Sequence, residues 1–507
     1  MKDEKLLEKA LSLFPTLYET RVEPAATVSP VRDDAGRVRM EQTEDFRLRR
    51  LKKGDRLVLD FGDHQVGYLS LQLGVRGSHA DAPVWLRFHF AEYAAELFED
   101  PTAYYGWICS SWVQTEQVHV DVLPSVLKLS RRYAFRYVSI EVLDISSKFD
   151  LAIEGALCRA VSSADDRVLV PYKAPDEMSR KLDATACRTL HNCMQTVFED
   201  GPKRDRRLWM GDLRIQARVN YETYRQNDLV KECLYLFAAL PAENGQVAAC
   251  LFLEPEPEAD DTVMLDYSLF FPAALLDYYK ATGDRETLQE LWPTALSQLY
   301  LAEARLTERD LIPDEDRMGW CFVDWNLALN KQGAAHGIFL YALRCGVETA
   351  GILGLEAEAQ RLQELYETCR KAANTLLWDE ESACYVSGKD RQISVATQVW
   401  MVLGGALEGK AAADLLKRTV SNPAAVSMVS PYMMHNYIDA LIAAGETEPA
   451  MQQMTAYWGG MLEAGADTFW ELYNPDNPEE SPYGGTIVNS YCHAWSCGPA
   501  YFLRKYQ

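Results

Sequence analysis

The sequence predicts a multidomain protein in which an N-terminal antiparallel β-sandwich is followed by an (α/α)6 toroid, a closed ring of helical hairpins. Up to about residue 165, apolar and polar side chains alternate in short runs, as in half-buried strands. From about residue 170 onward, apolar side chains recur at the spacing of amphipathic helices. The length of 507 residues also exceeds what one hydrophobic core usually serves. We therefore divide the chain into residues 1–45, 46–165 and 170–507.

Residues 1–45 are predicted to form a leading helix and an irregular, proline-containing connection. The first nine residues mix acidic and basic helix formers and lack the apolar core of a secretory signal. No apolar run in the chain reaches the membrane-spanning length of about 20 residues. We expect a cytoplasmic protein that has no membrane partner.

The sandwich is predicted from short alternating runs that are separated by Gly, Pro and Asp turns. Such runs are typical of antiparallel strands with one buried face. They cover residues 57–61, 68–75, 84–90, 118–122 and 137–143.

The ring is predicted from tight turns that join pairs of helices. A glycine ends one helix and an acid begins the next at Gly283, Gly354 and Gly445, which suits a left-handed cap and the helix dipole. We count roughly eleven or twelve helices, the number that an (α/α)6 ring needs. An α-solenoid is the alternative, but its repeats would be more regular. Longer irregular stretches recur at one end of the hairpins, where they would line a mouth of the ring: 240–262, 307–330, 377–393, 421–431 and 461–487.

Charge and cysteine content narrow the class of partner. A net charge of -23 disfavours nucleic acid and anionic lipid, so a neutral small molecule is the better ligand. The 12 cysteines are scattered singly, without a Cys-x-x-Cys pair or zinc-ligand spacing. We read them as buried free thiols in a reducing compartment, and we expect no metal and no cofactor. A homo-oligomer is possible.

The segment from residue 199 to residue 212 is the richest in chemistry-bearing side chains. Asp200, Asp205 and Asp212 alternate there with four cations, and Gly201, Pro202 and Gly211 resist continuous helix. A solvated, ion-paired loop is the alternative interpretation.

Other loops and helix entries combine aromatic rings with carboxylates or imidazoles. Aromatic faces stack on sugar rings, whereas carboxylates and imidazoles bind hydroxyls and transfer protons. Each group has a plainer alternative, such as a helix start or a core histidine. The groups are Asp324 with Trp325, His435, Trp470 with Glu471, and His493 with Trp495. If they fall on one side of the ring, they indicate a saccharide site.

Several of these segments resemble the motifs of the α-L-rhamnosidases, glycoside hydrolase family 78. Residues 200–212, with the pattern Asp-x-Pro-x-Arg-Asp-Arg followed by Trp-x-Gly-Asp, resemble the acid-bearing motif of that family. Residues 468–471 and 490–499 resemble its two C-terminal motifs in the same order, and residues 60–68 resemble a signature of its β-domain.

The resemblance implies an inverting glycosidase of carbohydrate metabolism that removes terminal α-L-rhamnosyl residues from small glycosides. It places the general acid on Asp205 and the base on Glu471, with the carboxyl groups about 6.5–9.5 Å apart to admit a water molecule. The substrate-binding residues would be Asp200, Arg204, Trp209, Asp212, Asp324, Trp325, His435, Trp470, His493 and Trp495.

The acid position departs from the family pattern, because Asp205 stands where a glutamate is usual. Two alternatives therefore stay open. One is a hydrolase of another terminal sugar on the same fold, and the other is a catalytically silent carbohydrate-binding homologue.

Overall fold

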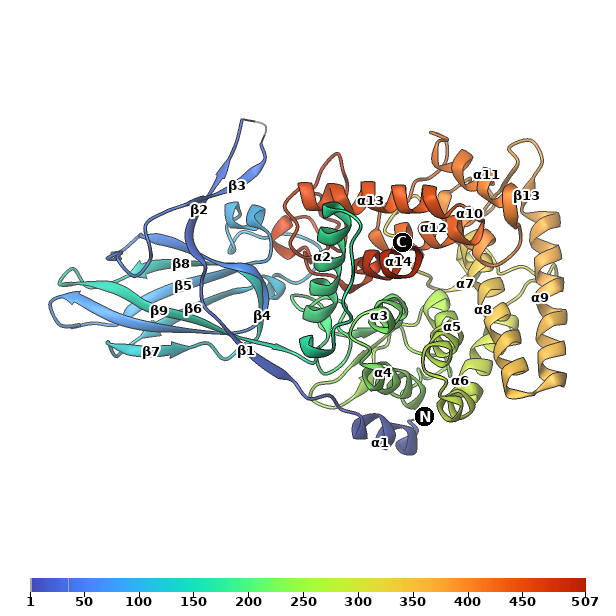
Figure 1. Cartoon of the computed structure of the whole chain (residues 1–507), viewed down its shortest axis with the longest axis horizontal. Coiled ribbons are helices and arrows are strands. Elements are labelled where there is room, and N and C mark those ends of the chain that lie inside the picture. The colour runs from blue at the N-terminus through green and yellow to red at the C-terminus, as the bar shows by residue number, and fades with distance from the viewer. Residues whose placement is uncertain (1, 35) are drawn as a thin grey trace.

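The computed structural model of the chain describes residues 2–34 and 36–507. A sheet domain forms one end of an elongated molecule, and a larger helical domain forms the rest (Figure 1). Helix α1 (Glu4–Ser12) precedes the sheet in sequence but packs on α4 (Asn227–Ala239) of the helical domain. The Asp3 side chain caps α1, and the Asp3 N–H donates to the Ala239 carbonyl at 2.9 Å. The chain therefore crosses between the domains twice.

The described residues of the sheet domain form one antiparallel network of nine strands. Its centre is β4 (Arg56–Gly77), which pairs with β2 and β8 through its first half and with β7 and β9 through its second. The pairing of β4 with β8 is interrupted by a register shift between Asp60 and Gln65. The network folds around a main apolar core, and a smaller apolar cluster lies between β2, β4 and the segment after β5. The other strands are β1 (Tyr18–Val22), β2 (Ala26–Arg32), β3 (Val38–Gln42), β5 (Val84–Ala91), β6 (Thr115–Val120), β7 (Ser125–Lys128), β8 (Tyr133–Asp144) and β9 (Phe149–Ser162).

The segment predicted as an irregular connection is largely strand, so that part of the expectation is wrong. Strand β1 pairs with β9, and the β2–β3 hairpin joins the sheet through β4. The alternation typical of strands is missing here because β1 exposes four of its five side chains and β2 contains Pro30. Strands of this kind bury too little apolar surface to show a period of two.

Helices of the second domain alternate between an outer and an inner layer of a closed ring. In the inner layer α3 packs on α5, α5 on α8, α8 on α10 and α10 on α12, and α14 packs back on α3. The inner helices are α3 (Met210–Glu222), α5 (Leu265–Thr282), α8 (Gln332–Leu353), α10 (Val395–Leu403), α12 (Pro431–Ala443) and α14 (Gly498–Tyr506). The outer ones are α2 (Glu177–Cys193), α4, α6 (Arg285–Glu303), α9 (Glu356–Leu376), α11 (Gly409–Val420) and α13 (Thr447–Glu463).

These helices make six hairpins within the described chain, as the sequence predicts. The turns have the expected geometry, since Gly283 and Gly354 both end their helices in the left-handed conformation. Asp284 then caps α6 by accepting the Thr287 N–H at 3.0 Å. Short elements in the loops are α7 (Glu315–Met318), β10 (Leu208–Trp209), β11 (Cys250–Phe252), β12 (Glu258–Ala259), β13 (Trp378–Asp379) and β14 (Cys384–Tyr385). Among the helices that the structure describes, none is both long and apolar enough to cross a membrane.

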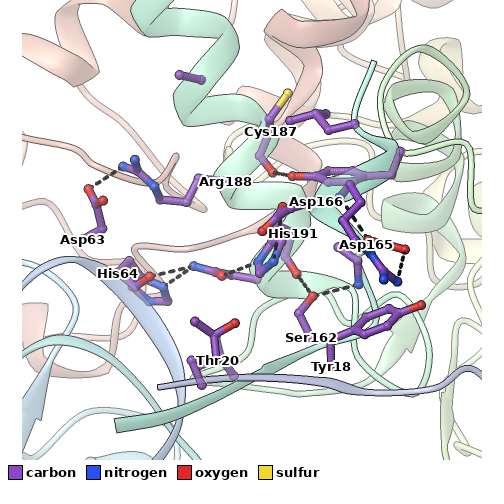
Figure 2. A pocket seen from close by; sticks show the side chains of 18 of the residues that line it. Tyr18, Thr20, Asp63, His64, Ser162, Asp165, Asp166, Cys187, Arg188 and His191 are labelled. Atoms are coloured by element: carbon purple, nitrogen blue, oxygen red, sulfur yellow. Dashed lines mark hydrogen bonds and ion pairs between the residues drawn. The ribbon is translucent and has the colours of Figure 1, made fainter. Parts of the chain in front are cut away.

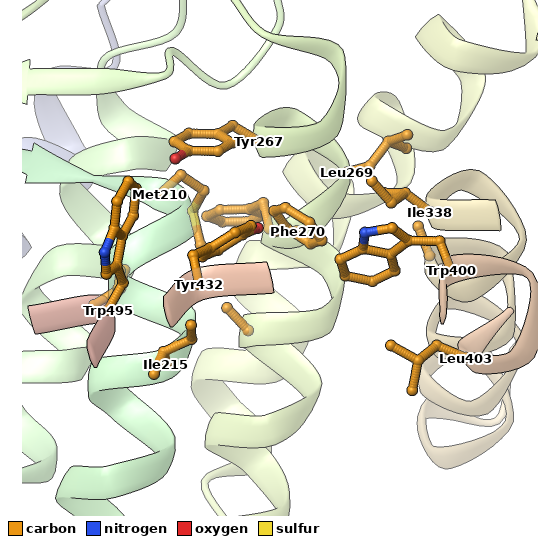
Figure 3. Close-up of a cluster of buried hydrophobic side chains, with 14 of the residues drawn as sticks. Met210, Ile215, Tyr267, Leu269, Phe270, Ile338, Trp400, Leu403, Tyr432 and Trp495 are labelled. Carbon is orange, nitrogen blue, oxygen red and sulfur yellow. The ribbon is translucent and has the colours of Figure 1, made fainter. Parts of the chain in front are cut away.

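The ring is filled by a core of aromatic and aliphatic side chains from the inner helices. Figure 3 shows Phe270 of α5 with Trp400 of α10 and Tyr432 of α12 on either side. The ring centroids lie 5.4 Å and 6.5 Å from that of Phe270. This core ties together three hairpins, including two that the α8 hairpin separates in the ring, and fixes the positions of the loops at their ends.

Replacement of Phe270 by alanine is expected to lower the free energy of unfolding by about 3–5 kcal/mol, because it leaves a cavity that the ring cannot fill. Chemical denaturation of the Phe270→Ala variant measures this loss. The Leu355→Ala variant removes a side chain that is 41% exposed and serves as the control. Equal effects in the two variants would show that Phe270 is not central to the core.

Candidate active site

A cavity of about 760 Å³ opens among the loops at one end of the ring. Loops from several hairpins surround it, together with Trp107 and Ile108 from the sheet domain. The cavity brings together most of the side chains that the sequence singles out: Asp200, Arg204, Asp205, Trp209, Asp212, Asp324, Trp325, Glu471, His493 and Trp495.

Asp205 is presented by a turn that the Asp200 carboxylate holds together. Asp200 accepts the backbone N–H of Asp205 at 3.3 Å and that of Arg207 at 3.1 Å. Arg206 between them has a positive φ of 64°, as a sharp turn requires. Burial and the neighbouring charge of Asp205 raise the pKa of Asp200 well above its ordinary value. Asp200 thus shapes the acid loop as well as lining the cavity.

Two glycines of the acid motif allow close contacts that a larger residue would block. A side chain at Gly201 would begin 2.6 Å from the Ser490 hydroxyl, in the segment that leads to His493. A side chain at Gly211 would begin 2.5 Å from the ring of Tyr267, which lines the cavity. These glycines therefore let the acid motif pack against other walls of the cavity.

One guanidinium lies between the two carboxylates that the sequence proposes as the catalytic pair. Arg204 donates through Nη2 to Glu471, and its Nη1 lies 3.9 Å from the Asp205 carboxylate. Its Nε donates to the Val488 carbonyl at 3.0 Å, and its plane covers the ring of Tyr483 at 4.0 Å. Burial disfavours the charged guanidinium, but the surrounding carboxylates, Glu471 first, outweigh it and raise the pKa of Arg204. The Arg204 guanidinium therefore bridges the two carboxyl groups.

Glu471 is fixed from several sides. Its carboxylate accepts hydrogen bonds from Arg204 and from the Tyr483 hydroxyl, one at each oxygen. Its backbone carbonyl accepts the Trp495 indole N–H at 3.0 Å. Each carboxylate oxygen has a second lone pair, so Glu471 can also accept a proton from a water molecule.

The same cavity also holds an ion pair between His493 and Asp212. His493 Nε2 lies 3.2 Å from Asp212 Oδ1, in an alignment that falls short of a hydrogen bond. Burial lowers the pKa of His493, but Asp212 and Glu471 overcome this and raise it to about 9. Among the described residues, the other ring nitrogen of His493 and the indole nitrogens of Trp209 and Trp325 have no hydrogen-bond partner. Buried polar groups without partners in one cavity are suited to binding a polyhydroxylated ligand.

Thermal stability is expected to fall between pH 6.5 and about pH 9 as His493 loses its proton. Its pKa is 6.5 ordinarily and about 9 in the fold, so in this interval the folded state holds a proton that the unfolded state releases. The stabilisation is complete below pH 6.5 and disappears as the pH rises through 9. Melting temperatures across this range should fall less steeply for the His493→Phe variant. Equal slopes for the two proteins would contradict this assignment.

Asp324 lines the cavity, but its oxygens are engaged within the protein. It accepts the N–H of Trp325 at 2.9 Å, the Ser430 hydroxyl at 2.6 Å and the Val429 N–H at 2.9 Å. Burial raises the pKa of Asp324 to about 6. Its contacts tie the loop before α8 to the start of α12 and so position Trp325.

His435 and Trp470 do not line the cavity. His435 is fully buried within the ring, 3.2 Å from an Arg218 nitrogen and against the ring of Phe502 at 4.7 Å. It lies more than a turn into α12, so it points into the core below the loops. Trp470 packs between Tyr93 and Tyr491, because neighbouring side chains along the segment face opposite ways. We therefore do not retain these two residues as substrate ligands.

Several side chains in the cavity were not identified from the sequence. Tyr483 donates a hydrogen bond to Glu471, and Tyr267 packs edge-on against Trp209. Trp107 and Trp320 are 68% and 54% exposed. All four line the cavity. The sequence signal that could have identified Trp107 is the aromatic run Tyr104-Tyr-Gly-Trp107 in a loop between strands.

A second cavity of about 790 Å³ lies between the sheet domain and α2 (Figure 2). Its charged groups are largely paired with one another. Arg188 bonds Asp63 across the domains at 2.9 Å, and Arg167 bonds Asp165 at 2.8 Å. None of the predicted site residues lines it. This cavity is an interdomain crevice, whereas the predicted acid and base, Asp205 and Glu471, both line the first cavity.

Family models match almost the whole chain. The N-terminal domain of glycosyl hydrolase family 78 α-rhamnosidases matches residues 25–160. The six-hairpin glycosidase domain of bacterial α-L-rhamnosidases matches residues 172–506. A comparison with curated proteins gave no match.

Solved structures agree with the family models. The structure described as a rhamnosidase from Klebsiella oxytoca with rhamnose bound is 42% identical, covers 100% of this chain and 99% of its own, and has a TM-score of 0.97. A family 78 rhamnosidase of Bacillus sp. GL1 is 22% identical over 92% of this chain and 49% of its own, with a TM-score of 0.78. An α-L-rhamnosidase of Streptomyces avermitilis complexed with L-rhamnose is 18% identical over 96% and 44%, with a TM-score of 0.69.

The last two relatives support the fold alone, whereas the first supports the family over the full length of the chain. Together with the family models, they confirm the predicted fold class and the resemblance carried by the three motifs. The chain therefore belongs to glycoside hydrolase family 78, and it is a glycosidase of the α-L-rhamnosidase type.

Proposed function

We propose that the enzyme removes terminal α-L-rhamnosyl residues from small glycosides with inversion, using Asp205 as the general acid and Glu471 as the base. The observation that carries this proposal is the guanidinium of Arg204, which lies between both carboxylates in the cavity. Inversion requires carboxyl groups far enough apart to admit a water molecule beside the sugar, and a guanidinium between them favours such a separation. The rhamnose bound to the 42% identical relative supports the choice of sugar.

In this mechanism Asp205 donates its proton to the glycosidic oxygen as the bond from that oxygen to the anomeric carbon breaks. A water molecule attacks the anomeric carbon from the opposite face, and Glu471 takes one of its protons. The products are the free sugar and the alcohol, and the proton returns from Glu471 to Asp205 through solvent. Arg204 and Tyr483 keep the Glu471 carboxylate oriented throughout.

The sugar would be bound by polar groups that line the cavity. Asp212, His493 and the indole N–H groups of Trp209 and Trp325 can each form a hydrogen bond with a sugar hydroxyl. The stacked rings of Phe322 and Trp495, 5.6 Å apart, give an apolar wall for the methyl group and C–H face of a deoxy sugar.

A small substrate fits the size and the mouth of the cavity. About 760 Å³ accommodates a monosaccharide with one further group of similar size. Trp107 stands at the mouth, held by its N–H bond to the Pro482 carbonyl at 2.7 Å. We propose that it contacts the part of the substrate that leaves with the glycosidic oxygen.

The Trp107→Ala variant is expected to raise KM for an aryl rhamnoside about 3-fold to 10-fold without changing kcat, because an aromatic contact contributes about 0.5–1.5 kcal/mol. The inhibition constant for free rhamnose should not change. Steady-state kinetics test this, with Tyr105→Ala as the control, since Tyr105 is 95% exposed and does not line the cavity. A lower kcat with an unchanged KM would contradict the assignment.

We propose a reducing, cytoplasmic setting for the enzyme. All 12 cysteines are free thiols, and all but Cys109 are buried. The sulfurs of Cys193 and Cys492 lie 4.0 Å apart, within hydrogen-bond range, and form no disulfide. Such a pair is suited to a compartment that keeps thiols reduced.

A panel of aryl glycosides of different sugars tests the proposed substrate. Release from the α-L-rhamnoside alone supports the proposal. Release from another sugar only would make the protein a different hydrolase on the same fold. Absence of release combined with saturable rhamnose binding by calorimetry would indicate a silent carbohydrate-binding homologue.

A further inference from the structure

We propose that three glutamates of the sheet domain position the catalytic loops of the helical domain. Glu92, Glu96 and Glu99 lie in and beside the short η1 helix (Ala94–Phe98) and are named here the carboxylate clamp. Each holds a different segment of the active-site wall. The inference rests on the proposed function, since it concerns the placement of Asp205, Glu471 and His493.

Glu96 holds the acid loop. Its carboxylate forms an ion pair with Lys203, and both side chains are 0% exposed. The other Glu96 oxygen accepts the backbone N–H groups of Glu92 at 2.8 Å and Tyr93 at 2.9 Å, which fixes the carboxylate in its own domain. Lys203 lies two residues before Asp205 in the chain. A displacement of this pair would therefore move the acid.

Glu99 holds the segment that carries Tyr483. It accepts both the backbone N–H of Thr486, at 2.9 Å, and the Thr486 hydroxyl. The same segment is held by Tyr104, whose hydroxyl donates to the Tyr483 carbonyl at 2.6 Å. Because the Tyr483 hydroxyl donates to Glu471, the contacts of Glu99 and Tyr104 with this segment help to orient the base.

Glu92 holds the segment that leads to His493. One of its oxygens accepts the Tyr491 N–H at 2.7 Å, and the other lies 2.9 Å from His64 Nε2. His64 in turn contacts Asn192 of α2 at 2.8 Å. All of these groups are buried, so the contact has little freedom to shift.

The reason for such a clamp lies in the short side chain of Asp205. A misplacement of about 1 Å of a reacting group can cost a hundredfold in rate. A carboxyl on a single methylene has less reach than a glutamate, so the backbone of the acid loop must place it correctly. A buried ion pair contributes little net stability but fixes one geometry, as the Lys203–Glu96 pair would do here.

The crevice between the domains offers a matched control. Arg188 of α2 and Asp63 of the sheet domain also form an interdomain ion pair, at 2.9 Å, but they are 32% and 54% exposed (Figure 2). Arg188 lies on the helix itself, but its Nη1 also donates to the Asp467 carbonyl at 3.1 Å, in the loop that carries Glu471. The control therefore changes Asp63 alone, which weakens the interdomain ion pair and leaves both the clamp and the Arg188–Asp467 contact in place.

The experiment compares the Glu96→Gln/Lys203→Met double variant with the Asp63→Asn variant. In the clamp variant both partners are replaced together, so that no buried charge is left alone. Kinetics use the glycoside that the wild type hydrolyses, and hydrogen–deuterium exchange follows residues 200–207 and 481–488. We expect the clamp variant to lose about 10-fold to 100-fold in kcat with KM within about 2-fold. Exchange should accelerate in both segments. The control should match the wild type in kcat, in KM and in the exchange of both segments.

An unchanged kcat in a clamp variant that melts as the wild type does would overturn the proposal. If the wild type hydrolyses no glycoside of the panel, the proposed function fails separately. The clamp is then judged by exchange alone, and unchanged exchange in residues 200–207 of the clamp variant overturns it.

Discussion

Replacement of Glu471 by glutamine is expected to lower kcat by about 10²-fold to 10⁴-fold, with KM nearly unchanged. The amide cannot take a proton from the attacking water, and general base catalysis contributes a factor of this size. The amide oxygen can still accept from Arg204 or Tyr483, so the surrounding contacts are largely kept. Steady-state kinetics on an aryl α-L-rhamnoside measure the loss.

The control for this prediction is Glu463→Gln, which changes an exposed glutamate at the end of α13. It should leave kcat unchanged. The assignment of the base would be wrong if the Glu471→Gln variant, folded as judged by its melting temperature, kept more than about a tenth of the wild-type kcat.

The second large effect is expected for Asp205→Asn, and its size should depend on the leaving group. An alkyl alcohol needs a proton as it departs, so hydrolysis of an alkyl rhamnoside should fall by about 10²-fold to 10⁴-fold. A nitrophenolate leaves readily without protonation, so the loss on a nitrophenyl rhamnoside should be much smaller. Comparison of kcat/KM for the two substrates in wild type and variant measures this difference.

An equal loss on both substrates would indicate that Asp205 binds the sugar and does not protonate the leaving oxygen. The Asp205→Glu variant provides a further control, because it keeps the acid and moves it by one methylene. It should retain more activity than Asp205→Asn on the alkyl rhamnoside.

The helical ring could be predicted because its signals are local. Glycines such as Gly283 and acids such as Asp284 mark the turns through backbone geometry and capping, which depend on few neighbours. The first strands could not be predicted, because β1 and β2 are stabilised by pairing with β9 and β4 rather than by their own pattern.

The candidate site could be predicted where its residues cluster in sequence. Asp200, Asp205 and Asp212 lie within one segment, and the family resemblance connected them to Glu471 and His493. The structure brings all five to one cavity.

Other contributions depend on contacts that no sequence pattern reveals. Tyr483 and Trp107 come from different domains and meet only in the folded chain, where their rings lie 5.4 Å apart. His435 has the residue type of a sugar ligand, but its depth in α12 places it in the core.

The stereochemistry of the first product tests the central proposal most directly. Proton NMR during the first minutes of hydrolysis of an aryl α-L-rhamnoside distinguishes the two anomers before they equilibrate. The roles assigned to Asp205 and Glu471 predict that β-L-rhamnose is formed first and that the α anomer then accumulates by mutarotation. Initial formation of α-L-rhamnose would contradict the inverting mechanism and the role of Glu471 as the base.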